Sequence, residues 1–166
     1  MIEKKALAIA KKAHKGQKDK AGVDYIEHPV AVASYCDIIA VRVAALLHDV
    51  VEDSDITPED LRGAGMNNNV IRAVECLTKK KDENIDEYYK RVAADDIAAA
   101  VKFADMRHNS DKSRWPADMQ EKAEENYQKY HGRAKRLFDM IGEKRAKDLM
   151  TAATYKWLTG KRKRGG

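Results

Sequence analysis

The spacing of hydrophobic residues predicts helices along most of the chain. In residues 2–14, alanine, leucine and isoleucine fall on one side of a helix and lysine on the other. Residues 44–53 begin as a nonpolar run without Gly or Pro, and Thr57 and Pro58 are typical of a helix cap and first helical position. Further helical patterns occupy residues 70–77, 85–94 and 95–107. The sequence therefore predicts an all-α fold, in which short connections make successive helices neighbours.

The last third of the chain, residues 116–158, reads as a long helical stretch rich in Glu and Lys and broken near Gly142. Its aromatic and aliphatic residues favour packing against the core or a homodimer interface, and nothing in it suggests chemistry. We expect a single domain over residues 1–160. Residues 161–166 carry four consecutive basic residues, which predicts a solvated, disordered tail.

Composition narrows the class of protein. The 166 residues are enough for one domain with a substantial core, and 36% of them are charged. The net charge is +5, but the basic tail supplies four of these charges, so we expect no nucleic-acid partner. No apolar run approaches membrane-spanning length, which predicts a cytoplasmic protein without a membrane partner.

Cys36 and Cys76 lie outside any paired-cysteine motif and are expected to be buried, reduced thiols.

Four ionisable residues end the nonpolar run at residues 44–53: His48, Asp49, Glu52 and Asp53. In one continuous helix, His48 and Glu52 would share a face, and so would Asp49 and Asp53. Unpaired charges beside a nonpolar core are costly. A divalent metal ion is the simplest partner for such a group.

Further candidate ligands follow the order His28, then His48 and Asp49, then Asp105. Pro29 places His28 in the first turn of a helix, where the missing N–H of proline does no harm. Asp105 follows a nonpolar helical stripe. Nitrogen and carboxylate ligands without thiolates suit manganese, iron or cobalt better than structural zinc or calcium.

Three segments carry a family resemblance. They are Ala-His-Lys-Gly-Gln through Tyr-Ile-Glu-His-Pro at residues 13–29, the run at residues 46–53, and Val-Lys-Phe-Ala-Asp with His-Asn at residues 101–109. Together they resemble the HD superfamily of metal-dependent phosphohydrolases. Within it they are most similar to the hydrolase domain of the Rel/Spo alarmone enzymes, which remove pyrophosphate from guanosine tetraphosphate and pentaphosphate.

The resemblance implies a compact helical bundle of the HD-domain type. It implies one divalent metal ion, most readily Mn²⁺, on His28, His48, Asp49 and Asp105. It also implies that Glu52 and Asp53 form the catalytic acid–base pair, although an exposed acidic loop is the alternative for these two residues. The expected reaction is hydrolysis of the 3′-pyrophosphate of the guanosine nucleotide.

The expected substrate contacts are Lys20, Asn109, Lys112 and Arg114. By analogy with the resembled enzymes, Asn109 faces the nucleotide, and the three basic side chains could bind phosphate. His14 and His108 are expected to pack or form hydrogen bonds rather than bind metal. One departure concerns the loop of residues 15–27. Asp19 stands where the resembled enzymes carry an arginine that stacks on guanine, and an aspartate can neither stack as a cation nor attract phosphate.

The altered loop leaves two alternatives to alarmone hydrolysis. The first is an HD phosphohydrolase acting on another nucleotide or phosphorylated metabolite. The second is a non-catalytic module that binds an alarmone, although retention of Glu52 and Asp53 argues against a site without turnover. A small-molecule nucleotide is the expected partner in the reading we favour.

Overall fold

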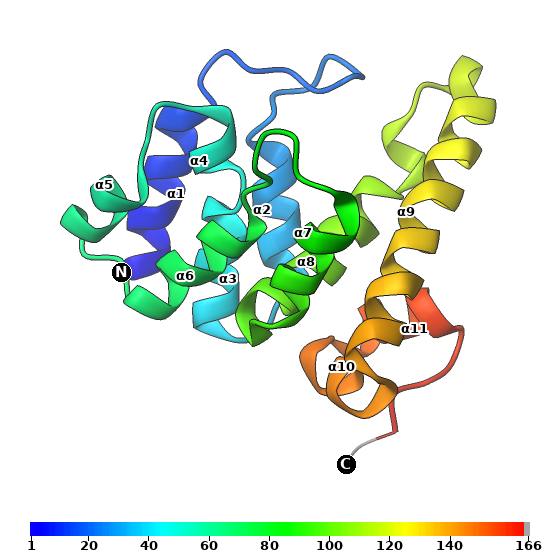
Figure 1. Ribbon diagram of the computed structural model, residues 1–166. Coiled ribbons are helices and arrows are strands. Elements are labelled where there is room, and N and C mark those ends of the chain that lie inside the picture. The colour runs from blue at the N-terminus through cyan, green and yellow to red at the C-terminus, as the bar shows by residue number, and fades with distance from the viewer. Residues whose placement is uncertain (165–166) are drawn as a thin grey trace.

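Helices joined by loops make up the fold, in a computed structural model that describes residues 1–164 (Figure 1). The described residues form no β-strand, and their only strand-like pairing is an isolated bridge between Lys18 and Asp24. The all-α prediction is therefore confirmed. The elements are α1 (Ile2–Ala13), α2 (Glu27–Ser34), α3 (Ile39–Leu47), α4 (Val50–Asp53), α5 (Pro58–Gly63), α6 (Asn68–Leu77), α7 (Ile85–Ala93), α8 (Asp96–Asn109), η1 (Lys112–Arg114), η2 (Ala117–Met119), α9 (Gln120–Ile141), α10 (Glu143–Leu149) and α11 (Ala152–Thr159).

Two helices, α3 and α8, form the centre of the core. Helix α3 packs against α1, α2, α6 and α8, and most of its residues are buried. Helix α8 also contacts α2, α6, α7 and α9, and four of its buried residues are alanines, whose small side chains allow close approach. The burial of nonpolar side chains on both helices fixes His48 and Asp49 after the end of α3 and Asp105 in the second half of α8, whereas His28 comes from α2.

The helix is interrupted by a turn at His48 and Asp49. The prediction of one continuous helix over residues 44–53 is wrong, because α3 ends at Leu47 and α4 begins at Val50. Asp49 has φ −103° and ψ −1°, near the bridge region of backbone conformation. Neighbouring side chains of a straight helix diverge by about 100°. The turn instead allows His48 and Asp49 to reach the same point.

The last third of the chain contains the predicted break at Gly142, where φ is +90°, and a second break between α10 and α11. In Figure 1 the long helix α9 lies along one side of the molecule, with α10 and α11 at its end. None of the helices within residues 1–164 is long and apolar enough to cross a membrane. In the basic segment, Lys163 Nζ donates a hydrogen bond to Met150 O over 2.6 Å, while residues 165–166 of the predicted tail lie outside the described residues.

The two cysteines differ in their environments. Cys36 is buried as expected, and burial raises the pKa of its thiol to about 12. Cys76 is a free thiol as expected but is only partly buried, so the prediction of a buried side chain is wrong for this residue. It lies on α6, where the neighbouring positions Val74 and Leu77 face the core more directly.

Thr57 begins α5 with the predicted cap. Its Oγ1 accepts from Asp60 N over 3.2 Å, and Asp60 Oδ2 accepts from Thr57 N over 2.8 Å. Thr57→Ala is expected to lower the free energy of unfolding by about 1 kcal/mol, because one cap acceptor is lost. Urea unfolding measures this loss, and Thr57→Ser, which keeps the hydroxyl, should stay close to the wild type. Equal losses in both variants would contradict a capping role.

Candidate metal centre and adjoining cavity

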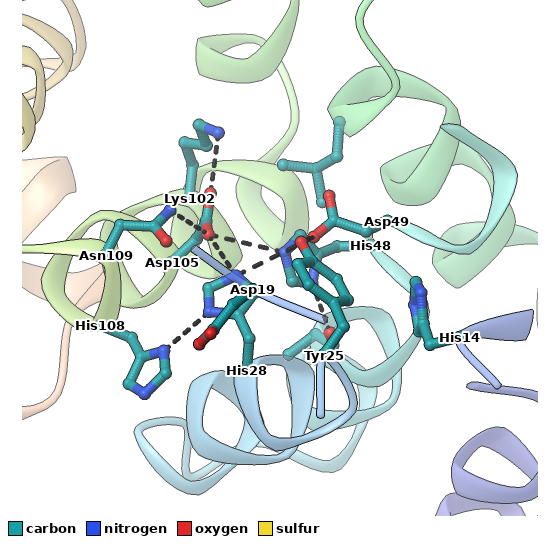
Figure 2. A network of polar contacts seen from close by, with 12 residues as sticks. His14, Asp19, Tyr25, His28, His48, Asp49, Lys102, Asp105, His108 and Asn109 are labelled. Carbon is teal, nitrogen blue, oxygen red and sulfur yellow. Dashed lines mark hydrogen bonds and ion pairs between the residues drawn. The ribbon is translucent and has the colours of Figure 1, made fainter. Parts of the chain in front are cut away.

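Four predicted ligands converge at the meeting point of α2, α3 and α8 (Figure 2). His28 Nε2 lies 2.9 Å from Asp105 Oδ1, and His48 Nε2 lies 2.9 Å from Asp49 Oδ2 and 3.5 Å from Asp105 Oδ1. One donor atom each of His28, His48 and Asp49 lies within 4.8 Å of the others. His28, His48 and Asp105 are buried. The arrangement can hold a divalent metal ion.

Both imidazoles present Nε2 to the carboxylates. His48 Nδ1 is 2.6 Å from Ala45 O, to which it donates, and His28 Nδ1 is 2.7 Å from His108 Nδ1. Burial, followed by the charge of Arg114, lowers the pKa of His108 to about 3, so this ring is neutral and can accept from His28. The lone pairs of both Nε2 atoms are then available to a metal ion.

The site also suits a cation electrostatically. His48 Nε2 is buried and makes no hydrogen bond of good geometry, despite its short distance to Asp49. Burial by itself would lower the pKa of His48, but Asp49 and Asp105 outweigh it and raise that pKa. The two anions that would hold a proton on Nε2 would equally hold a divalent cation, so the residues present fit such an ion.

Neighbouring side chains fix the two carboxylates. Tyr25 Oη donates to Asp49 Oδ2 over 2.5 Å, and burial raises the pKa of this tyrosine, which keeps it a donor. Lys102 Nζ lies 2.8 Å from Asp105 Oδ2, and Asn109 Nδ2 donates to Asp105 Oδ1 over 2.9 Å. Such outer contacts orient metal ligands and restrict their rotation.

A cavity of about 500 Å³ opens beside the candidate metal ligands. Its lining includes Glu52 and several aromatic side chains, among them Trp115 and Tyr130. Six basic side chains also line it, against four carboxylates, and this excess of positive charge suits a ligand with several negative charges. The basic side chains are Lys18, Lys20, Lys79, Lys102, Arg114 and Arg133.

Most of the predicted substrate-contact residues reach this cavity. Lys20, Asn109 and Arg114 line it, together with the four predicted metal ligands. The structure does not bring Lys112 there, because its ammonium group forms an ion pair with Glu124 and lies over the ring of Tyr127, 4.7 Å from the centroid.

Of the two predicted acid–base residues, only Glu52 lines the cavity. Glu52 lines the cavity, and its Oε1 accepts from Lys79 N over 2.7 Å. Burial raises the pKa of Glu52, opposed by this hydrogen bond and assisted by the charges of Asp49 and Asp53. Asp53 is not among the lining residues, and its backbone O accepts from Gln17 Nε2 over 2.9 Å. Glu52 is therefore better placed than Asp53 to meet a ligand.

His14 and His108 occupy the roles expected of them. His14 Nδ1 lies 2.9 Å from Gln17 Oε1, and Figure 2 shows the ring beyond Tyr25, away from the carboxylates. His108 contacts His28 rather than the shared point of the candidate ligands.

Sequence reasoning missed several residues at the site. Tyr25 and Lys102 lie inside segments that carried the family resemblance, and the spacing of three residues between Lys102 and Asp105 places both on one helical face. Tyr130 and Arg133 come from α9, whose pattern suggested no chemistry. No local signal in α9 marks them, because they reach the cavity only through the packing of α9 against α7 and α8.

Fold and site together define a helical domain in which a cluster of His and Asp side chains, able to hold a metal ion, lies beside a cavity lined by basic residues. The HD domain family matches residues 6–130, and the chain belongs to this family.

Relatives of this chain include large alarmone enzymes. A guanosine-3′,5′-bis(diphosphate) 3′-pyrophosphohydrolase of Haemophilus influenzae is 38% identical over 117 residues, covering 61% of this chain and 17% of the relative. The bifunctional (p)ppGpp synthase/hydrolase SpoT of Escherichia coli is 33% identical over 123 residues, covering 64% and 17%. A GTP pyrophosphokinase of Streptomyces coelicolor is 31% identical, covering 91% and 20%. The chain thus spans about a fifth of the length of these curated relatives.

A solved structure shares the fold. It is described as a metazoan ortholog of SpoT that hydrolyses ppGpp, and it aligns with a TM-score of 0.59 at 22% identity. The alignment covers 85% of this chain and 96% of that one. The predicted HD-type helical bundle is therefore confirmed.

Proposed function

We propose that this chain is a metal-dependent hydrolase that removes the 3′-pyrophosphate from guanosine tetraphosphate and pentaphosphate, giving GDP or GTP and pyrophosphate. The observation that carries the proposal is the convergence of His28, His48, Asp49 and Asp105 beside a cavity lined with basic side chains. The names of the curated relatives and of the solved structure support the choice of nucleotide.

The proposed cofactor is one divalent ion, most readily Mn²⁺, on these four side chains. When bound, such an ion would lower the pKa of a water molecule and polarise a phosphoryl oxygen. Tyr25, Lys102 and Asn109 hold the two carboxylates in orientation through the hydrogen bonds described above. The protein thereby keeps the ligand set rigid during turnover.

Glu52 is the proposed general acid–base group, because it lines the cavity one helical turn after the His48–Asp49 turn. It accepts a proton from the attacking water or returns one to the departing 3′ oxygen of the ribose. Asp53 is proposed as the second member of the pair, with the smaller contribution that its position outside the cavity lining implies. Lys20, Arg114 and Asn109 are the proposed nucleotide contacts on the cavity wall.

The replacement of the family's stacking arginine by Asp19 favours a second candidate, an HD phosphohydrolase with a different nucleotide preference. Asp19 lines the cavity, so the difference lies at the site itself. A panel of nucleotides assayed with Mn²⁺ separates the two candidates. Release of pyrophosphate marks the alarmone reaction, whereas orthophosphate release from other nucleotides marks the alternative.

Purified protein is expected to release pyrophosphate from guanosine tetraphosphate in the presence of Mn²⁺, leaving GDP. Treatment with a chelator should stop the release, and added Mn²⁺ should restore it, because the site depends on a divalent ion. Chromatography of the nucleotide product together with a pyrophosphate assay measures both products. Binding of the nucleotide without any product would contradict the proposal and favour an alarmone-binding module.

A further inference from the structure

Asp19 and Arg114 form an ion pair that joins two walls of the cavity. Arg114 Nη2 lies 3.3 Å from Asp19 Oδ2, and Arg114 Nη1 donates to His108 O over 3.1 Å. Both side chains line the cavity and are partly exposed, Asp19 to 17% and Arg114 to 24%. The pair connects the loop before α2 to η1, the short helix that follows α8, and the two residues are 95 apart in sequence.

The Asp19 carboxylate is itself fixed by its loop. Its Oδ1 accepts from Ala21 N over 2.9 Å and from Val23 N over 3.0 Å, and Asp19 N donates to Val23 O. One carboxylate oxygen therefore organises the turn, while the other faces Arg114. An acceptor held in this way can determine where a guanidinium lies.

Arg114 has the properties that Asp19 lacks. A guanidinium is planar, permanently charged and able to stack on a base or bind phosphate through two donors. Only two of its five N–H groups are used by Asp19 and His108 in the contacts above, so donors remain for a ligand. A partly exposed ion pair contributes little to stability, so orientation is the more significant consequence of this contact.

We propose that Asp19 is a positioning residue, which holds Arg114 in the cavity wall as the planar cation that binds the nucleotide. The inference rests on the proposed function for the identity of the nucleotide. The planar cation is thus supplied by η1 and is held there by the loop of residues 15–27.

Asp19→Asn and Arg114→Gln test this arrangement by steady-state kinetics. Asparagine keeps Oδ1 for the amides of Ala21 and Val23 but puts an NH₂ group where Oδ2 faces Arg114. Each variant is expected to raise KM for guanosine tetraphosphate about tenfold, the effect of losing one charge-assisted contact. The kcat should stay within about twofold, because the metal ligands and Glu52 are untouched.

The double variant distinguishes positioning from independent binding. If Asp19 acts through Arg114, Asp19→Asn with Arg114→Gln should be no worse than Arg114→Gln alone. Lys112→Gln is the matched control, because Lys112 pairs with Glu124 outside the cavity lining, and its KM should equal that of the wild type. Additive losses, or a wild-type KM in Asp19→Asn, would overturn the proposal.

A measurement without substrate separates this inference from the proposed function. Phenylglyoxal modification of Arg114, followed by mass spectrometry, should be slow in the wild type and several-fold faster in Asp19→Asn. The more exposed Arg145, paired with Asp96, serves as the internal reference in the same sample. Absence of pyrophosphate release by the wild type would refute the proposed function only. Equal labelling of Arg114 in wild type and variant would refute the positioning role.

Discussion

Asp49→Asn is expected to remove the bound metal ion and to lower pyrophosphate release by about 10³-fold or more, because both water activation and phosphoryl polarisation depend on that ion. Asparagine has nearly the shape of aspartate, and its carbonyl oxygen can still accept from Tyr25 Oη. The substitution therefore removes a negative ligand from beside His48 while it preserves the turn between α3 and α4.

Two measurements check this result. Elemental analysis after dialysis should find Mn²⁺ in the wild type and none in Asp49→Asn. Thermal unfolding should reveal a stabilisation of the wild type by the metal, about 2.7 kcal/mol at a free concentration 100 times Kd, that the variant lacks. Asp37→Asn, at an exposed position between α2 and α3, is the control and should behave as the wild type. Full metal content with full turnover in Asp49→Asn would exclude this residue as a ligand.

Glu52→Gln is expected to reduce kcat by about 10²- to 10⁴-fold with little change in KM or metal content, which is the range for loss of a general acid–base group. Glutamine can still accept from Lys79 N through its carbonyl oxygen, so the loop after α6 should keep its place. The missing property is the ability to take up and release a proton. Loss of activity without loss of metal therefore distinguishes Glu52 from the ligands.

Two comparison variants sharpen the test of Glu52. Asp53→Asn should have a smaller effect than Glu52→Gln, because Asp53 does not line the cavity. Glu59→Gln changes a carboxylate on α5 that pairs with Arg62, and it should leave all kinetic constants unchanged. A larger loss for Asp53→Asn than for Glu52→Gln would assign the proton transfer to Asp53 instead.

Local sequence was enough to predict the helices and the set of candidate ligands. The pattern of apolar positions placed α6, α7 and α8 within a few residues of their observed bounds, since burial of one helical face determines each element. The order of His28, His48, Asp49 and Asp105 could be read before any geometry was known. The resemblance of the surrounding segments to the HD family, rather than composition or spacing alone, singled out His28 and Asp105.

Other features depend on packing and left no local signal. The turn at His48 and Asp49 interrupts a sequence with good helical character, and it forms where α3 meets α8 and the carboxylates find partners. The pairing of Asp19 with Arg114 joins residues 95 apart in sequence. Asp19 looked like a lost contact in the sequence, whereas the structure connects it to the cation that we propose replaces the missing arginine.

The contribution of α9 to the cavity wall has a consequence for biosynthesis. A nascent chain that has emerged only as far as Asn109 already carries every candidate metal ligand, but it lacks Tyr130 and Arg133. The cavity can be completed only after α9 has been synthesised and has docked on α7 and α8. The order of translation therefore brings out the complete set of candidate metal ligands before the last part of the cavity wall.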